Sequence, residues 1–252
     1  AIDALARMTH RGAIAADGKT GDGCGLLLKK PDAFFREVAA EQGFELTDPY
    51  AVGMVFLSTD EAAADHARST LNAELAARGL TVAGWREVPT DPSACGQEAL
   101  NSLPRIEQVF VNAPAGLDEA AFDRELYVAR RKAEQTLEPA DETFYVPSLA
   151  SQVIAYKGLV MPAYLPTFFR DLGEGGMASS MAVFHQRFST NTWPRWRLAQ
   201  PFRYLAHNGE INTIQGNRNW SVARAHKFAS ELLPFDEVRP LVSLSGSASN
   251  SL

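Results

Sequence analysis

Apolar residues recur at helical spacing in several stretches of the chain. Pro31 begins one of these patterns and Gly43 ends it, and Gly79 ends a longer one that covers 60–78. The same spacing runs over 119–136, over 212–228, and through a first helix that ends at Gly12. Each pattern predicts an amphipathic helix that buries one face.

Runs of apolar and β-branched residues predict strands between these helices. They cover 26–28, 50–58, 80–88, 106–111, 151–157, 181–184 and 202–206. Several of these strands follow one another closely enough to pair as hairpins, and they do not alternate strictly with helices. The order of elements therefore predicts an α+β fold rather than a parallel βαβ fold. The stretches 17–25 and 187–200 are expected to be loops.

The composition is that of a globular protein, with 46% apolar and 21% charged residues among 252. The net charge of −6 argues against nucleic acid or a membrane surface as a partner. No apolar run approaches the roughly 18 residues that cross a membrane. Cys24 and Cys95 are too few for a disulfide framework. We therefore expect a reducing compartment, the cytoplasm.

Neither end of the sequence carries a boundary signal. Ala1 already lies inside the first helical pattern, and the chain stops at Leu252 without a capping residue. We therefore expect residues 1–252 to form one domain of a longer protein, truncated at both ends.

The glycine-rich stretch 17–25 is a candidate phosphate loop. In a Walker motif the Lys-Thr pair follows the glycines, whereas Lys19-Thr20 precedes most of them here, and a strand rather than a helix comes next. A tight loop that needs glycine conformations is the better interpretation. Cys24 has no base near it in sequence, which favours a buried thiol over a nucleophile.

Histidines and arginines offer two further candidate sites. The histidines at 10, 185, 207 and 226 lack the spacing of a metal motif, so we expect no metal site. The stretch 187–203 combines four arginines with aromatic residues and no acid. That composition suits stacking on a nucleic acid, and it suits a pocket for a small carboxylate equally well. The acidic remainder of the chain favours the carboxylate.

The strongest chemical signal lies in 184–191 and 204–213. An Asn-Gly pair after a strand commonly forms only a turn. However, the side-chain amide of Asn208 and the backbone N–H of Gly209 are also the two donors that a tetrahedral oxyanion needs. Arg187 offers a bidentate donor for a carboxylate. These residues indicate acyl transfer on a small substrate that carries a carboxylate, although no nucleophile accompanies them.

Longer runs of residues connect this chemistry to a known family. They are Met8 to Ala13, the Gly-Asp-Gly-Cys-Gly loop at 21–25, the stretch 184–192, and above all His207 to Ile214 followed by Gly216-Asn217-Arg218. With them the whole chain resembles the class II glutamine amidotransferase domain of bacterial glutamate synthase large subunits. The extended run His-Asn-Gly-Glu-Ile-Asn-Thr is specific to glutamate synthases, whereas His-Asn-Gly occurs across class II amidotransferases.

The resemblance implies an N-terminal nucleophile hydrolase fold, with four αββα layers around two stacked antiparallel sheets. It also implies that an N-terminal cysteine thiol attacks the glutamine side-chain amide, while the α-amino group of that cysteine, with a pKa of about 8, acts as base. Glutamate and ammonia are the products. Asn208 and Gly209 would form the oxyanion hole. The glutamine pocket would be lined by Arg11, Arg187, Phe188 and Thr190, with Arg187 on the α-carboxylate.

Two features depart from the family pattern. The nucleophilic cysteine would lie upstream of Ala1, and neither Cys24 nor Cys95 has a free α-amine, so residues 1–252 alone are expected to be inactive. The family sequence Gly-Ser-Asp-Ser reads Gly246-Ser247-Ala248-Ser249 here. The family aspartate binds the α-ammonium of glutamine, so Ala248 removes an anionic partner of the substrate.

The resemblance further implies partners outside this chain, which itself would bind L-glutamine and no cofactor. Ammonia would pass to synthase domains of the parent chain, which carry FMN and an iron–sulfur cluster and convert 2-oxoglutarate to glutamate. An NAD(P)H-oxidising small subunit would supply the electrons. Two alternatives stay open. One is a degenerate nucleophile-fold domain that acts as a scaffold or glutamine sensor. The other is an amidotransferase for an aminosugar or purine precursor, against which the run 210–213 argues.

Overall fold

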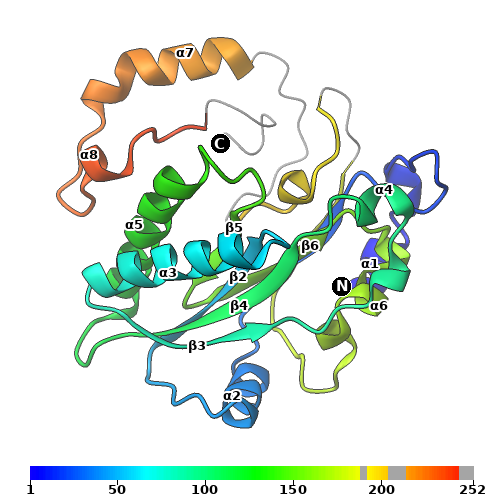
Figure 1. The fold of residues 1–252 in the computed structure, drawn as a ribbon, viewed down its shortest axis with the longest axis horizontal. Coiled ribbons are helices and arrows are strands. Elements are labelled where there is room, and N and C mark those ends of the chain that lie inside the picture. Colours follow the sequence, from blue (N-terminus) through cyan, green and yellow to red (C-terminus); the bar gives the residue numbers. More distant parts are fainter. Residues whose placement is uncertain (188–191, 204–213, 244–252) are drawn as a thin grey trace.

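The computed structural model describes residues 1–187, 192–203 and 214–243 (Figure 1). The strands are β1 (Cys24–Lys29), β2 (Tyr50–Leu57), β3 (Thr81–Glu87), β4 (Arg105–Asn112), β5 (Tyr145–Ala150), β6 (Val153–Gly158) and β7 (Ala182–Gln186). The α-helices are α1 (Ile2–Ala6), α2 (Asp32–Glu41), α3 (Glu61–Ala77), α4 (Gln97–Leu100), α5 (Glu119–Leu137), α6 (Leu165–Phe168), α7 (Ile214–Arg224) and α8 (Phe235–Val238). Short 3-10 helices include Thr9–Arg11, Pro92–Ala94, Arg170–Gly173 and Trp196–Leu198.

The described strands form two antiparallel sheets, with the strand orders β6-β1-β7 and β3-β4-β2-β5. In the three-stranded sheet, Gly25 of β1 pairs with Lys157 of β6 on one side and with His185 of β7 on the other. In the four-stranded sheet, β2 pairs with β4 along its whole length, from Tyr50 opposite Asn112 onward. The predicted α+β class and the antiparallel pairing of two sheets are confirmed.

The main hydrophobic core lies between the two sheets. Val52, Met54 and Phe56 of β2 point into it, and Leu26 and Leu28 of β1 enter it from the other sheet. Successive side chains of a strand alternate between its faces, so the intervening residues of β2 are buried against helices instead. This burial on both faces is why the run 50–57 is almost continuously apolar.

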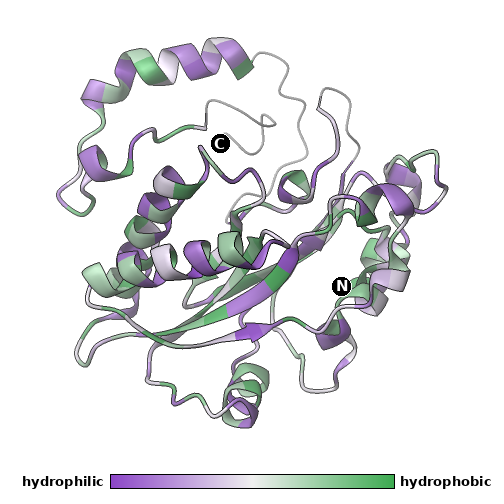
Figure 2. Cartoon of the chain, in the orientation of Figure 1, coloured by the Kyte–Doolittle hydropathy of each residue, from purple (hydrophilic) through white to green (hydrophobic). Residues whose placement is uncertain are grey.

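Helices α3 and α5 cover the outer face of the four-stranded sheet (Figure 1). The side chain of Asp60 caps α3 by accepting a hydrogen bond from Ala63 N at 2.9 Å. Gly79 lies just beyond the helix at a φ of 75°, a conformation that only glycine adopts without strain. Figure 2 shows hydrophobic and hydrophilic residues mixed along both helices, as expected when one face of each is buried.

A buried polar network joins the two sheets. Arg86 of β3 donates two hydrogen bonds to the Asp171 carboxylate, at 2.8 and 2.9 Å, and Tyr156 of β6 donates a third at 2.9 Å. Gln108 of β4 donates to the Tyr156 hydroxyl and accepts from Arg86. Burial, reinforced by Asp171, raises the pKa of Tyr156 well above its usual value, so the phenol remains a donor. The network therefore stabilises the packing of β3, β4 and β6.

Most of the predicted elements are confirmed by the structure. The helices expected from Pro31, over 60–78 and over 119–136 are α2, α3 and α5. The strands expected over 50–58, 80–88, 106–111, 151–157 and 181–184 correspond to β2, β3, β4, β6 and β7. The helix expected over 212–228 is α7 in its described part, but α7 ends at Arg224 and a 3-10 turn follows at Ala225–Lys227. The strand expected over 26–28 is β1, which begins earlier, inside the glycine-rich loop.

Two further predictions of local structure are wrong, and one strand was missed. The first helix does not reach Gly12, because α1 ends at Ala6 and a separate 3-10 turn follows. Strand β5 was missed, because it contains Pro147 and proline is unusual in a strand. The proline fits here because β5 is an edge strand and its pairing with β2 is irregular at that point. Arg203 is not part of a strand, because it lies in a turn at a φ of 36°. Residues 204–206 of that predicted strand lie outside the described residues.

Candidate functional site

Two of the predicted pocket residues lie within the described part of the chain. Arg11 ends the 3-10 turn after α1 and is exposed, whereas Arg187 follows β7 directly and is 5% exposed. The remaining predicted site residues lie outside the described residues: Phe188, Thr190, Asn208, Gly209 and Ala248.

Two backbone carbonyls of the glycine-rich loop accept hydrogen bonds from Arg187. Its Nη1 donates to Asp22 O at 3.2 Å, and its backbone N donates to Gly23 O at 2.9 Å. Its Nη2 donates to Thr192 Oγ1 at 2.5 Å. Burial lowers the pKa of Arg187, partly offset by the negative charge of Asp22, but a guanidinium remains charged at neutral pH. A fixed, buried cation with further N–H groups is a suitable partner for a small carboxylate.

The glycines of this loop permit close packing rather than phosphate binding. Gly23 has a φ of 116°, and a Cβ there would lie 2.8 Å from Ala199 Cβ. A Cβ on Gly25 would lie 2.5 Å from Lys157 Cβ. Phosphate loops direct backbone N–H groups toward their anion, whereas this loop directs the carbonyl oxygen of Asp22 toward the guanidinium of Arg187. The expectation of a tight structural loop is confirmed.

Gly12, the neighbour of Arg11, packs against the end of β7, the strand that precedes Arg187. The side-chain amide of Gln186 packs so closely on Gly12 that a Cβ there would lie 1.6 Å from Gln186 Nε2. Gln186 itself is 6% exposed and is the last residue of β7. The absence of a side chain at Gly12 thus lets the turn that carries Arg11 rest against the end of the strand that precedes Arg187.

The segment 196–203 packs over the same end of the three-stranded sheet. Trp196 packs on Gly158, where a Cβ would lie 2.4 Å from the indole ring, and Trp196 Nε1 donates to Ala99 O at 3.1 Å. Lys157, which is fully buried, donates to Arg197 O at 3.1 Å and lies 4.3 Å from the centre of the Phe202 ring. Burial and the nearby arginines lower the pKa of Lys157 well below its usual value.

A buried carboxylate on α5 holds the end of this segment. Glu134 accepts hydrogen bonds from Arg130 at 2.6 Å, from Arg131 at 2.7 Å and from Arg203 at 3.0 Å. Burial alone would raise the pKa of Glu134, but the three guanidinium groups lower it to about 2. Arg131 also donates to Pro240 O at 2.7 Å. Glu134 thus helps to fix Arg203 directly and Pro240 through Arg131; these two residues precede 204–213 and 244–252.

Acid is expected to destabilise the fold partly through Glu134. Its pKa is near 4.3 in an unfolded chain and lower in the fold, so its stabilising contribution is complete above about pH 4.3 and is lost as the pH falls toward 2. In urea unfolding between about pH 5 and pH 3, Glu134→Gln should show a shallower loss of stability than the unaltered chain. Parallel curves for Glu134→Gln would contradict this role.

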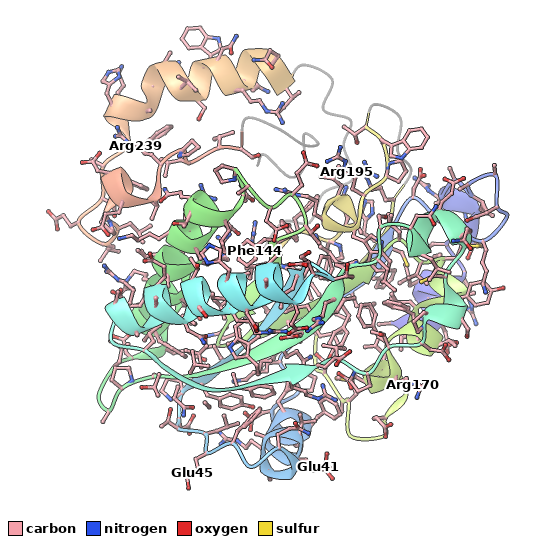
Figure 3. The ribbon with its side chains drawn as sticks, in the orientation of Figure 1. Glu41, Glu45, Phe144, Arg170, Arg195 and Arg239 are labelled. Atoms are coloured by element: carbon pink, nitrogen blue, oxygen red, sulfur yellow. The ribbon has the colours of Figure 1, made fainter. Side chains whose placement is uncertain are left out.

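The arginines of 187–203 do not form an exposed basic surface. Arg197 pairs with Glu138 and Arg203 pairs with Glu134, each at 3.0 Å. Arg195, which is labelled in Figure 3, is exposed and pairs with Glu142 at 3.2 Å. Because most of these guanidinium groups are turned to internal partners, the stretch fits a carboxylate pocket better than a surface on which nucleic acid could stack.

Neither cysteine is placed to act as a nucleophile. Cys24 is fully buried, its thiol donates to Val160 O at 3.0 Å, and burial raises its pKa far above the usual value. Burial likewise raises the pKa of Cys95 to about 11. Both groups remain thiols at neutral pH, and only a thiolate attacks an acyl carbon efficiently.

Within 1–187, 192–203 and 214–243, no three histidine, cysteine or acidic side chains come together as metal ligands. None of the helices described is both long and apolar enough to cross a membrane.

Lys157 and Glu134 are the residues of this region that the sequence did not reveal. Lys157 occupies one polar position in an otherwise apolar strand, which on its own suggests an exposed side chain. Glu134 stands three and four residues after arginines, a spacing typical of ion pairs on a helix surface. Only the packing of 196–203 against the sheet and α5 buries these two groups.

Comparison with known proteins extends over the whole chain. Residues 1–252 match the family model described as glutamine amidotransferases class-II. The chain is 42% identical over 251 residues, 98% of its length, to the glutamate synthase [NADPH] large chain of Bacillus subtilis (strain 168). It is 40% identical over 258 residues, 100% of its length, to the protein of the same name from Azospirillum brasilense.

The name of a third relative states a different electron donor, ferredoxin. The chain is 42% identical over 226 residues, 89% of its length, to ferredoxin-dependent glutamate synthase 2 of Synechocystis sp. (strain ATCC 27184 / PCC 6803 / Kazusa). The chain spans only 16%, 17% and 14% of the length of these three relatives, respectively.

Proposed function

The chain belongs to the class-II glutamine amidotransferases, and from this membership we propose that it is the glutamine-hydrolysing domain of a glutamate synthase. The family has the N-terminal nucleophile fold, which confirms the fold expected from the sequence. The observation that best supports the proposal is Arg187, a buried guanidinium directly after β7 that donates to the carbonyl of Asp22 and to the hydroxyl of Thr192. It suits the α-carboxylate of L-glutamine.

The proposed reaction uses a thiol supplied by an N-terminal cysteine upstream of Ala1. The thiol sulfur bonds to the amide carbon of glutamine while the α-amine of that cysteine takes the thiol proton. Asn208 and Gly209 would donate hydrogen bonds to the oxyanion that forms. The C–N bond then breaks, ammonia leaves with the proton, and water hydrolyses the thioester to glutamate. Arg11, Arg187, Phe188 and Thr190 would line the pocket.

The rest of the proposed parent protein would use the ammonia. Synthase domains on the same chain would combine it with 2-oxoglutarate, with electrons from an NAD(P)H-oxidising small subunit in the cytoplasm. We place FMN and the iron–sulfur cluster in those domains. The residues here do not suit a cluster, because the sequence has only Cys24 and Cys95 and both thiols are buried.

Replacing Arg187 tests the proposed pocket. Arg187→Lys in the complete protein should raise the KM for glutamine about tenfold and leave kcat within a few-fold, because a point charge cannot reproduce two parallel N–H bonds to a carboxylate. Steady-state ammonia release gives both constants. Arg195→Lys, in the exposed pair with Glu142, is the matched control and should change neither constant. An unchanged KM in Arg187→Lys, with altered retention on a polyanion column, would favour nucleic acid instead.

A further inference from the structure

The glycine-rich loop that holds Arg187 is itself fixed by one carboxylate. Asp17 Oδ1 accepts from the backbone N of Lys19 at 2.9 Å and of Thr20 at 2.7 Å. Its Oδ2 accepts from Thr20 Oγ1 at 2.6 Å and from the backbone N of Glu98 at 3.0 Å. These four bonds lower the pKa of Asp17 far below its usual value, so it is charged throughout the physiological range.

The contact with Glu98 joins two segments that are distant in sequence. Thr20 Oγ1, which Asp17 holds, also accepts from the backbone N of Ala99 at 3.1 Å. The interface is tight, because a Cβ on Gly96 would lie 2.4 Å from both Asp17 Oδ2 and Thr20 Oγ1. The loop is therefore anchored on the turn that begins α4 and has little freedom to shift.

Beyond Asp17 the loop leads to the two carbonyls that accept hydrogen bonds from Arg187. Ala15 N donates to Thr20 O at 2.8 Å, and Ile14 forms a bridge with Gly21, so the anchored residues close a short hairpin. The next two residues supply Asp22 O and Gly23 O, the acceptors for Arg187. The path from the Asp17 carboxylate to the guanidinium thus consists of hydrogen bonds and a few backbone bonds.

We propose that Asp17 is a positioning residue for Arg187, which sets the affinity of the site for the substrate carboxylate without taking part in the reaction. This inference rests on the proposed function. Without the Asp17 carboxylate, Thr20 loses two of its hydrogen bonds and the loop that leads to Asp22 is held less firmly, so the guanidinium is held less firmly in one orientation. The loss affects substrate binding rather than chemistry at the amide carbon.

The test is a double-mutant cycle in the complete protein, with ammonia release from glutamine as the assay. Asp17→Ala should raise KM about fivefold or more and leave kcat within about twofold. In the Arg187→Lys background the same substitution should add little, because the two changes act on one interaction. Asp60→Ala is the matched control, since that carboxylate also accepts from a backbone N–H but lies at the start of α3. It should leave KM unchanged in both backgrounds.

A second variant disturbs the anchor while keeping its charge. Gly96→Ala places a methyl group against Asp17 and Thr20 and should also raise KM, which keeps the inference testable if Asp17→Ala fails to fold. Independent, multiplicative effects of Asp17→Ala and Arg187→Lys would overturn the inference, as would an unchanged KM in both Asp17→Ala and Gly96→Ala. Absence of glutamine hydrolysis in the unaltered protein would instead overturn the proposed function, and this inference with it.

Discussion

Asn208→Ala in the complete protein is expected to lower kcat for glutamine hydrolysis about 10²- to 10³-fold with little change in KM. That is the size of effect produced by removing one donor from an oxyanion hole, about 2.7–4 kcal/mol of transition-state stabilisation. The neutral amide of ground-state glutamine carries no full negative charge on its oxygen, so the donor acts mainly in the transition state. Steady-state ammonia release over a range of glutamine concentrations separates kcat from KM.

The control for this experiment is an asparagine with no proposed role in the reaction. Asn101 lies just after α4, is exposed, and accepts a hydrogen bond from Gln97 Nε2 at 2.9 Å. Asn101→Ala should leave both constants unchanged. If kcat of Asn208→Ala stays within a few-fold of the unaltered protein, Asn208 is a turn residue and the oxyanion assignment fails.

Asp171→Ala is expected to destabilise the chain by about 3–5 kcal/mol, the loss typical when one partner of a buried ion pair is removed. Arg86 would keep its charge in a place where its side chain is only 11% exposed, and Tyr156 would lose its acceptor. The loss should appear as a lower urea midpoint with an unchanged slope, followed by fluorescence or circular dichroism.

An exposed ion pair gives the matched comparison for this effect. Arg195 and Glu142 are 58% and 82% exposed, and solvent screening leaves such pairs about 0–1 kcal/mol of stabilisation. Glu142→Ala should therefore shift the free energy of unfolding by less than about 1 kcal/mol. Equal effects of the two substitutions would show that the Asp171 network does not hold β3, β4 and β6 together.

The elements that the sequence predicted correctly are those whose signals are local. Helix α3 has apolar residues four apart, a capping Asp60 and a terminating Gly79, and all three signals describe the helix itself. Strand β2 is a long apolar run because both of its faces are buried. The first helix was predicted too long, because α1 ends at Ala6; Gly12 instead packs on the side chain of Gln186, a contact with a strand more than 170 residues later that no local pattern encodes.

The candidate site likewise contains one residue that the sequence indicated and several contacts that it did not. Arg187 stood out in the sequence because its residue type and its neighbours suit a carboxylate. The carbonyls of Asp22 and Gly23 accept from its Nη1 and its backbone N, respectively. They lie close to Arg187 only because β1 pairs with β7. Asp17 and Glu134 make contacts between segments distant in sequence, and no local pattern indicates such contacts.

The most direct test of the account is ammonia release from L-glutamine by two polypeptides, one comprising residues 1–252 and the other continuing upstream to the N-terminal cysteine. If the proposed upstream cysteine is the nucleophile, the longer polypeptide should release ammonia and residues 1–252 should give no release above the buffer background, with or without Cys24→Ala, because the buried thiol of Cys24 cannot take its place. The absence of release from the longer polypeptide, or release from residues 1–252 that Cys24→Ala abolishes, would contradict the proposed function.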